Sequence, residues 1–257
     1  MARDAAGETR MSRRIALVTG AGDGLGRAIA LDLARHGYDL AVTDLETGLL
    51  KTTVEETTAE GARVLPVALD LRRQGSIEAA LDIAAALGPL DLLVNNAAFT
   101  LNRPAIDFGW DEYDAVMDVN LKGTYFLTTG YARRCIAAAR AGAVVMLAST
   151  HGLTGLAGRS VYGISKGGIV QMTRMLAIEW AESGVRVNAV APATVITPSR
   201  AQMLADPARR AAMLERLPQR RFPTAEEVAA AVRYLGGAEA ASVTGQILAV
   251  DGGLTAA

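Results

Sequence analysis

The chain has a single cysteine among its 257 residues, and this scarcity excludes two common kinds of site. Cys135 cannot form an internal disulfide, which fits a reducing compartment and predicts a cytoplasmic protein. The sequence has only two histidines and no cluster of cysteines and histidines with zinc-ligand spacing, so we expect no metal site. Apolar neighbours predict that Cys135 is a packed structural thiol rather than a nucleophile.

Long hydrophobic runs and an excess of charge of one sign are also missing. No apolar run approaches the roughly 18 residues that a membrane span requires. The formal net charge is -1 and the basic residues are scattered, so we expect neither nucleic acid nor a membrane as partner. Residues 1–12 are polar, lack the apolar core of a secretion signal and predict a flexible tail. A small molecule is the expected partner.

Short apolar runs alternate with longer amphipathic stretches along the rest of the chain, which is typical of βαβ units around a parallel sheet. Residues 13–257 are therefore expected to form one α/β domain, a Rossmann-type doubly wound sheet of about seven strands with helices on both faces. The expected strands are 15–19, 39–43, 63–68, 90–94, 143–148, 185–191 and 246–250. The expected helices are 26–36, 49–60, 77–87, 110–139, 161–182 and 224–235. The pattern loosens over 198–223, which we interpret as a substrate lid.

The first expected strand runs into the sequence TGAGDGLG, from Thr19 to Gly26, and then into a helix. Glycines at such a turn let the backbone approach a pyrophosphate at the helix N-terminus. The spacing alone is a weak signal, because any tight strand-to-helix turn can use glycine. Its position in the first βα unit makes it typical of dinucleotide binding.

Asp44 ends the second expected strand, roughly 20 residues beyond these glycines, where a carboxylate can bind an adenosine ribose and repel a 2′-phosphate. A 2′-phosphate would also find no basic side chain nearby in the sequence, because the neighbouring positions are Asp23, Leu45 and Glu46. The sequence therefore favours NAD over NADP. The alternative is that Asp44 is a solvated strand-end residue or a cap for the next helix.

Tyr162 and Lys166 lie one helical turn apart in the sequence YGISK. A free tyrosine titrates near about 10, and an adjacent positive charge stabilises the phenolate and lowers the pKa. The pair can then act as a general acid and base. The same spacing also arises by chance where an aromatic residue packs beside a lysine stem.

Taken in order, these motifs resemble the short-chain dehydrogenase/reductase family over nearly everything from Arg14 to Gly253. The matching sequences are TGAGDGLG, DL at Asp70, NNAA at Asn95, VNLKG at Val119, Ser149, YGISK, VNAVAPATVIT at Val187 and VTGQILAVDGG at Val243.

The resemblance implies that Ser149, Tyr162 and Lys166 form a catalytic core, completed by Asn120. Tyr162 exchanges a proton with a secondary alcohol or ketone, and Ser149 binds the substrate oxygen. Lys166 lowers the pKa of Tyr162 and binds the nicotinamide ribose. Asn120 holds a helix kink and a water that relays protons from Lys166; a purely structural role is the alternative.

The resemblance also implies a set of residues that bind NAD. They are Gly20, Asp23, Gly24, Leu25, Gly26, Asp44, Leu45, Asp70, Leu71, Asn96, Ala97, Ala98, Tyr162, Lys166, Pro192, Val195 and Thr197. Core packing is the alternative for Val195. Relatives usually have glycine where this chain has Ala98 and Ala193, and a methyl group narrows the space and disfavours positive φ.

His151 and Arg159 flank the catalytic positions in the sequence, and Arg200 follows in the expected lid. Arginine binds a carboxylate bidentately and histidine can add a hydrogen bond, so these residues predict a hydroxy-acid or sugar-acid substrate. An ordinary loop histidine and solvated surface arginines are the alternatives.

Other functions remain open at this point. A neutral sugar or polyol is a second substrate class, and a 3-oxoacyl-[acyl-carrier-protein] reductase is a third, although Asp44 disfavours the NADPH that such reductases use. A non-catalytic NAD-binding sensor or scaffold requires only the fold. By resemblance, we expect a homotetramer built through the long helices.

Overall fold

The computed structural model describes residues 13–197 and 205–256, and the predicted fold is confirmed there. These residues form a seven-stranded sheet with the order β3-β2-β1-β4-β5-β6-β7, in which every neighbouring pair is parallel. The strand order reverses between β1 and β4, which is where open α/β sheets hold their ligands.

The strands are β1 (Arg14–Thr19), β2 (Tyr38–Asp44), β3 (Val64–Ala68), β4 (Leu92–Asn95), β5 (Gly142–Leu147), β6 (Val185–Pro192) and β7 (Ile247–Val250). The α-helices are α1 (Gly24–Arg35), α2 (Lys51–Ala59), α3 (Gln74–Ala84), α4 (Trp110–Met117), α5 (Thr124–Ala137), α6 (Ser160–Trp180), α8 (Pro207–Glu215) and α9 (Ala225–Gly236). Most bounds lie within a few residues of the predicted ones.

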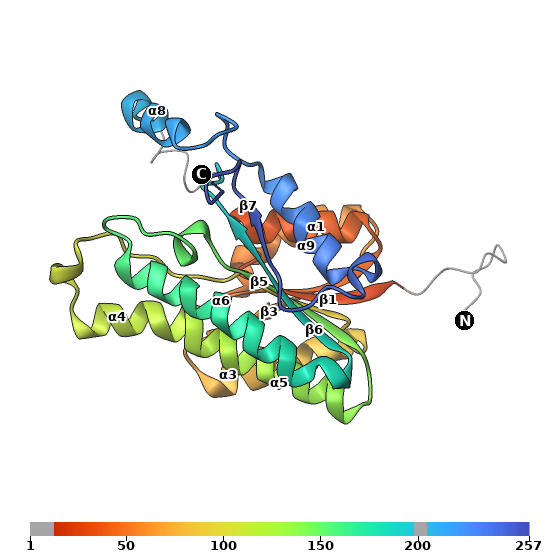
Figure 1. Cartoon of the computed structure of the whole chain (residues 1–257). Helices are drawn as coiled ribbons and strands as arrows, with labels where there is room; N and C mark the ends of the chain where they lie inside the picture. Colours follow the sequence, from red (N-terminus) through yellow and green to blue (C-terminus); the bar gives the residue numbers. More distant parts are fainter. Residues whose placement is uncertain (1–12, 198–204, 257) are drawn as a thin grey trace.

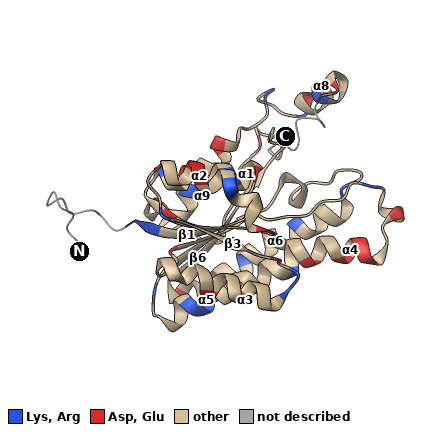
Figure 2. Ribbon diagram, turned by 180° about the vertical axis from the view of Figure 1, so that it is seen from behind, with Lys and Arg blue, Asp and Glu red and all other residues tan. Residues whose placement is uncertain are grey.

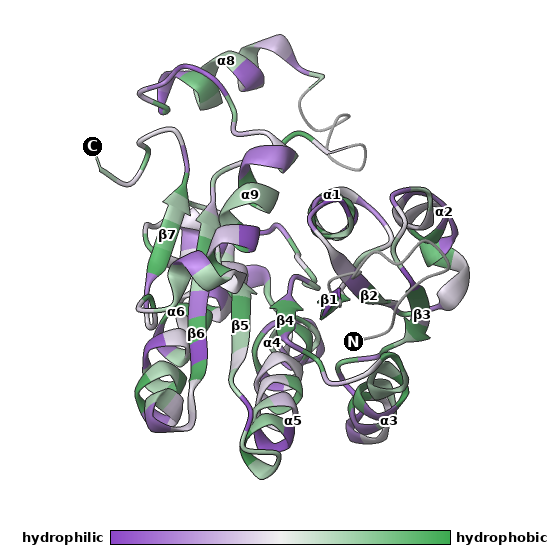
Figure 3. Cartoon of the chain, turned by 90° about the vertical axis from the view of Figure 1, so that its right-hand side faces the viewer, coloured by the Kyte–Doolittle hydropathy of each residue, from purple (hydrophilic) through white to green (hydrophobic). Residues whose placement is uncertain are grey.

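Alternate residues of each strand face opposite sides of the sheet, so the sheet has two cores. Ile15 and Leu17 of β1 pack with α3, α5 and α6 in one core. Ala16 and Val18 pack with α1 and α9 in the other. Figure 3 shows these two helix layers on either side of the strands. Burial on both faces explains why the strands are nearly all apolar.

Charged side chains lie mainly outside these cores. Figure 2 shows Lys, Arg, Asp and Glu distributed over the helices and loops of both layers. Within the described part of the chain, no helix has the length and hydropathy that a membrane crossing requires.

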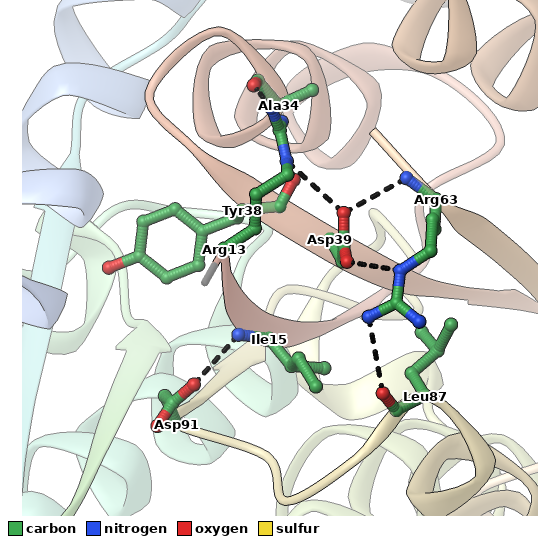
Figure 4. Close-up of polar contacts among 8 residues, drawn as sticks. All are labelled: Arg13, Ile15, Ala34, Tyr38, Asp39, Arg63, Leu87 and Asp91. Atoms are coloured by element: carbon green, nitrogen blue, oxygen red, sulfur yellow. Dashed lines mark hydrogen bonds and ion pairs between the residues drawn. The ribbon is translucent and has the colours of Figure 1, made fainter. Parts of the chain in front are cut away.

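A polar cluster fixes the amino-terminal end of the sheet (Figure 4). Asp39 of β2 is 2% exposed and accepts hydrogen bonds from the backbone N and the Nε of Arg63, at 3.0 and 2.6 Å. It also forms an ion pair with Arg13 at 3.1 Å. Asp91 accepts a hydrogen bond from the backbone N of Ile15 at 2.8 Å. These contacts hold strand starts together, and the opposite, carboxyl end of the sheet is left for a site.

The expected helix over 110–139 is present as α4 and α5, which run on through a π-helical turn at the place where the resemblance implies a kink at Asn120. A π-helical segment, Asp118–Gly123, separates α4 from α5. Gly123 explains the local packing, because a Cβ there would lie 2.2 Å from the backbone O of Leu71. The helix therefore approaches the loop after β3 more closely than a side chain permits.

The predicted lid over 198–223 is described only from residue 205 onward. Figure 1 shows α8 standing apart from the α/β body. The segment that follows α8 returns to the body through a small apolar cluster of Leu217, Phe222 and Ala193. Whether this segment moves over a substrate stays a prediction.

Candidate functional site

Two cavities meet at the carboxyl end of the sheet. A cleft of about 580 Å³ lies over the ends of β1, β2, β4 and β5, and a second cavity of about 890 Å³ lies beside it. Ser149, Tyr162 and Ala193 line both. The hydroxyl-bearing residues predicted to be catalytic thus stand on the wall common to the two spaces.

The glycine-rich turn forms the floor of the cleft in a conformation that side chains would block. Gly20 and Gly24 have φ of +62° and +60°, in the left-handed region. A Cβ on Gly26 would lie 2.0 Å from the backbone O of Gly20. Asn96 supports the turn, donating from Nδ2 to the backbone O of Thr19 and Gly20 at 2.8 and 3.0 Å.

The helix that follows this turn begins without a side-chain cap. Asp23 is the N-cap residue of α1, and it makes no side-chain capping hydrogen bond. The first backbone N–H groups of a helix then need another acceptor, and an anion is a favourable one. This end of the cleft therefore fits the pyrophosphate of a dinucleotide.

The end of β2 supplies polar groups to the same cleft. Asp44 Oδ2 accepts from the backbone N of Gly22 at 3.0 Å, and Oδ1 from that of Leu45 at 2.9 Å. Thr43 is fully buried, and its Oγ1 has no hydrogen-bond partner among the described residues although the residue lines the cleft. A buried hydroxyl needs a partner, which a bound nucleoside can provide. Sequence reasoning missed Thr43.

A second residue that sequence reasoning missed is Arg72, on the cleft wall after β3. Its Nε and Nη2 donate to the two carboxylate oxygens of Asp70 at 2.9 and 2.8 Å. This guanidinium lowers the pKa of the Asp70 carboxyl, mainly through the side-chain hydrogen bonds. The repeated arginines after Asp70 in the sequence were the available signal.

The cleft brings together most of the predicted cofactor residues. Those that line it are Gly20, Asp23, Gly24, Leu25, Asp44, Leu45, Asp70, Leu71, Asn96, Ala97, Ala98, Tyr162, Lys166, Pro192 and Thr197. Gly26 and Val195 do not. Gly26 lies buried behind the turn, and Val195 is fully buried in the core that contains α1 and α9.

The two alanines that replace the usual glycines need no unusual backbone. Ala98 and Ala193 both line the cleft. The non-glycine residues with positive φ in the described chain are Ala139 and Arg220, so neither of the two alanines is strained in that way.

Lys166 and Tyr162 both face the cleft from the first turns of α6. Lys166 is 3% exposed, and its Nζ donates to the backbone O of Leu147, at the end of β5, at 2.6 Å. The same Nζ lies 5.7 Å from the centre of the Tyr162 ring. A buried ammonium is thus held beside the phenol, as the spacing in the sequence predicts.

Ser149 approaches this helix through a close contact that glycine permits. It is the N-cap residue of a 3₁₀ turn, η5 (Thr150–Gly152). A Cβ on Gly152 would lie 2.6 Å from the backbone C and O of Lys166. A Cβ on Gly163 would lie 3.0 Å from the backbone O of His151. The turn can therefore pack directly against the backbone of α6.

Asn120 lies in the π-helical segment and lines neither cavity. Its side chain is 1% exposed and forms a pair of hydrogen bonds with Phe99, accepting from the backbone N at 2.7 Å and donating to the backbone O at 2.9 Å. Nδ2 also donates to Ser165 Oγ at 3.0 Å. Asn120 thus ties the π segment to the loop after β4 and to α6.

The second cavity contains two of the three predicted substrate residues, His151 and Arg159. His151 Nδ1 lies 3.1 Å from Ser149 Oγ, and its ring centre lies 6.0 Å from that of Tyr162. Arg159 donates from Nη1 to Thr100 Oγ1 at 3.1 Å. Arg200 lies outside the described residues.

The charged residues in the described lining of this cavity are all basic. Besides His151 and Arg159 it is lined by Arg103 and Arg216, which sequence reasoning missed, and its described lining includes no aspartate or glutamate. Arg103 is neutralised by Glu112 at 2.7 Å. The described lining thus has basic but no acidic side chains, which favours an anion.

The acids, cysteine and histidines of the described chain form no group that could hold a metal ion.

The chain is similar to known dehydrogenases and reductases. A family model described as enoyl-(acyl carrier protein) reductase matches residues 20–255. The chain is 35% identical over 241 residues to 2-dehydro-3-deoxy-D-gluconate 5-dehydrogenase of Escherichia coli (strain K12), covering 93% of this chain and 94% of the relative. It is also 35% identical over 246 residues to the 3-oxoacyl-[acyl-carrier-protein] reductase FabG of Thermotoga maritima, covering 95% and 99%.

A solved structure is also similar over nearly its whole length. Gluconate 5-dehydrogenase from Burkholderia cenocepacia J2315, in complex with NADP and tartrate, superposes with a TM-score of 0.90 at 30% sequence identity. The match covers 96% of this chain and 97% of that one.

Proposed function

Because the chain belongs to the short-chain dehydrogenase/reductase family, whose members bind a nicotinamide cofactor, we propose that it is an NAD-dependent dehydrogenase of a small hydroxy acid or sugar acid. It interconverts a secondary alcohol and a ketone in catabolism. The observation that carries the proposal is the shared wall: Ser149 and Tyr162 face both the cofactor cleft and a cavity whose described lining has basic but no acidic residues.

The dinucleotide, when bound, supplies the acceptor for the hydride. The chain itself handles the proton. In alcohol oxidation Tyr162 Oη takes the proton of the substrate hydroxyl, and in ketone reduction it returns one. Ser149 Oγ donates a hydrogen bond to the substrate oxygen and thereby orients it toward Tyr162.

Lys166 serves this chemistry by its charge and its fixed position. Its Nζ is anchored on Leu147 O at 2.6 Å, beside the Tyr162 ring. A positive charge there stabilises the phenolate form of Tyr162. Asn120 contributes indirectly, because its side chain is occupied by Phe99 and Ser165 and holds the chain around the site.

Asp44 supports NAD over NADP. Its carboxylate stands at the end of β2 on the cleft wall, and Asp23 and Leu45 beside it bring no positive charge. Arg72 on the same wall is paired with Asp70 at 2.8 Å, so a 2′-phosphate at this place would be repelled by the Asp44 carboxylate. The B. cenocepacia structure contains NADP, so the choice needs a direct test. We expect NADH to bind at least tenfold more tightly than NADPH in a fluorescence titration, and equal affinities would show that Asp44 has another role.

The acid substrate is supported by the cavity's charge and by the sugar-acid dehydrogenases among the relatives. The similarity to the T. maritima FabG favours an acyl-carrier-protein reductase as the second candidate. Asp44 argues against it, because such reductases usually draw on NADPH.

The experiment that tests the function is an absorbance screen for NADH formation across hydroxy acids, sugar acids, neutral sugars and polyols. Each substrate is run with NAD and with NADP, and 3-oxoacyl thioesters are run in the reducing direction. The proposal expects the highest kcat/KM for an acid with NAD. A thioester with NADPH as the best pair would establish the second candidate instead.

We also propose that the enzyme is a homotetramer. Exposed apolar side chains on α4 and α6 support this, since Trp110, Ile164 and Ile178 are 88%, 56% and 78% exposed. Light scattering after size-exclusion chromatography measures the mass directly. A monomer at micromolar concentration would contradict the proposal.

A further inference from the structure

Arg216 stands at a place in the substrate cavity that the proposed mechanism does not use. It is the C-cap residue of α8, so it comes from a segment far along the chain from His151 and Arg159. The same cavity wall includes Leu217 and Phe222.

The backbone around Arg216 is fixed to the body of the domain. The next residue, Leu217, is 3% exposed and packs with Phe222 and Ala193. Gln219 donates its backbone N–H to the O of Gly252 at 3.1 Å. The position of Arg216 beside the cavity is therefore held by packing on both the core and the C-terminal segment.

The charge of Arg216 is not neutralised within the described chain. The other arginines of the cavity have partners, since Arg103 pairs with Glu112 and Arg159 contacts Thr100. For Arg216, no carboxylate of the described residues lies within ion-pair distance. The neighbouring Arg221 shows the contrast, because it is bound by Glu227 at 2.7 Å.

The simplest alternative is that Arg216 stabilises the C-terminal end of α8, where a positive charge interacts favourably with the helix dipole. That role needs only a charge and no particular ligand. It predicts that substitution changes the stability of the enzyme equally in the presence of acidic and neutral ligands.

We propose that Arg216 binds a carboxylate of the substrate and is a specificity-determining residue of this site. The inference rests on the proposed function and adds to it that the anion is recognised by Arg216 at the end of α8 as well as by Arg159 just before α6. A guanidinium and a carboxylate form paired hydrogen bonds that a neutral hydroxymethyl group cannot replace. Arg216 therefore selects acids over the polyols of the same carbon chain.

The test measures ligand binding to the enzyme saturated with NADH, so that no turnover is required. Isothermal titration calorimetry gives the Kd of two acids, D-gluconate and L-tartrate, and of their neutral partners D-glucitol and L-threitol. For Arg216→Gln we expect the Kd of at least one acid to rise about tenfold. The Kd of its neutral partner should change less than about twofold.

Two further variants separate charge recognition from structure. Arg216→Lys keeps the charge and should recover part of the lost affinity. Arg220→Gln removes an exposed arginine of the same segment that does not line the cavity and that donates to the backbone O of Glu215 at the end of α8. It tests whether a disturbed end of α8 alone changes ligand binding, and it should leave all four Kd values unchanged.

The outcomes distinguish the two proposals. A wild-type enzyme that binds neither acid more tightly than its neutral partner would overturn the proposed function, and the role of Arg216 with it. A wild-type preference for acids that Arg216→Gln retains in full would overturn the role of Arg216 alone. Equal losses for acid and neutral ligands would show that Arg216 acts on the structure of α8.

Discussion

The cofactor cleft and the substrate cavity share a wall, yet they are built in different ways. The cleft is formed by turns that directly follow buried strands, and its glycines approach neighbouring backbone atoms to within distances that exclude a side chain. The cavity is formed by loops, the start of α6 and the segment around α8. Its character comes from a few charged side chains on exposed segments. A substitution at a glycine of the cleft should therefore distort the backbone that binds the cofactor. A substitution at an arginine of the cavity should instead remove a charge that binds the substrate.

The largest effect is expected at the shared wall. Tyr162→Phe removes only the hydroxyl that exchanges the proton, so kcat should fall by about 10²–10⁴-fold. The affinity for NADH should stay within a few-fold of wild type, because the ring and Lys166 remain. Stopped-flow rates and fluorescence titration measure the two quantities. A variant with near-normal turnover would remove Tyr162 from its proposed role.

The second largest effect is expected for Gly26→Ala, which changes the glycine turn of the cofactor cleft. In Gly26→Ala the new Cβ would lie 2.0 Å from Gly20 O and 2.6 Å from Asn96 Nδ2. The turn must shift, so we expect a loss of about 1–3 kcal/mol in the free energy of unfolding and a higher Kd for NADH. Urea unfolding and fluorescence titration are the measurements.

Gly75→Ala is the matched control for that variant. Gly75 lies in α3, with no atom within 4 Å of an added Cβ. The free energy of unfolding of the Gly75→Ala variant should be equal to or higher than that of wild type, because alanine favours the helix. Normal NADH binding by Gly26→Ala would mean that the tight turn is not needed for the cofactor.

A smaller effect, confined to the cavity, is expected for Arg159→Ala. Loss of the guanidinium should raise the KM for an acid substrate about tenfold and leave the KM of its neutral amide or lactone unchanged. The affinity for NADH should not change, since Arg159 does not line the cleft. Equal increases for acid and neutral substrates would indicate lost packing, for example of the contact with Thr100.

The smallest effect concerns the segment behind the cavity. Glu227 binds Arg221 and the backbone N of Thr224 at the start of α9, and these contacts lower its pKa from 4.5 to about 2. A lowered pKa in the folded state stabilises the protein above about pH 4.5, and this contribution is lost as the pH falls toward about 2. Because both side chains are exposed to solvent, which screens the pair, the contribution should be small.

The variant Glu227→Gln tests this direction of the pH dependence of stability. Its Tm should lie slightly below that of wild type at pH 7, and the difference should shrink as the pH is lowered below about 4.5. NADH binding should be unaffected. A difference that grows toward low pH would contradict the assignment.

The contrast between the two regions also explains what could be predicted from the sequence. The sheet and the glycine turn follow from apolar periodicity and from a turn that requires glycine. Asp44 follows from its place at a strand end, and Tyr162 and Lys166 from their spacing in a motif. Even there, Thr43 was missed, because an orphaned hydroxyl is visible only once the surrounding hydrogen bonds are known. The helix predicted over 110–139 is confirmed, but apolar periodicity gives no signal for its π-helical turn, and the close contact of Gly123 with Leu71 is visible only in the structure.

The substrate cavity was predicted only where its residues neighbour a motif. His151 and Arg159 lie close in sequence to Ser149 and Tyr162. Arg103 and Arg216 come from segments without a pattern, and tertiary folding alone brings them to the same space. Charge on exposed segments has no periodic signal, so the sequence does not tell which arginine faces a cavity.

Ser149 and Tyr162 on the shared wall are proposed to serve the oxidation of an anionic hydroxy compound by NAD. The most direct test is the ratio of kcat/KM for a sugar acid to that for the polyol of the same carbon chain, measured on the wild-type enzyme with NAD. We predict a ratio of at least about ten, the factor expected from one lost charge-assisted hydrogen bond. A ratio of one or less, with measurable turnover of the polyol, would contradict the account.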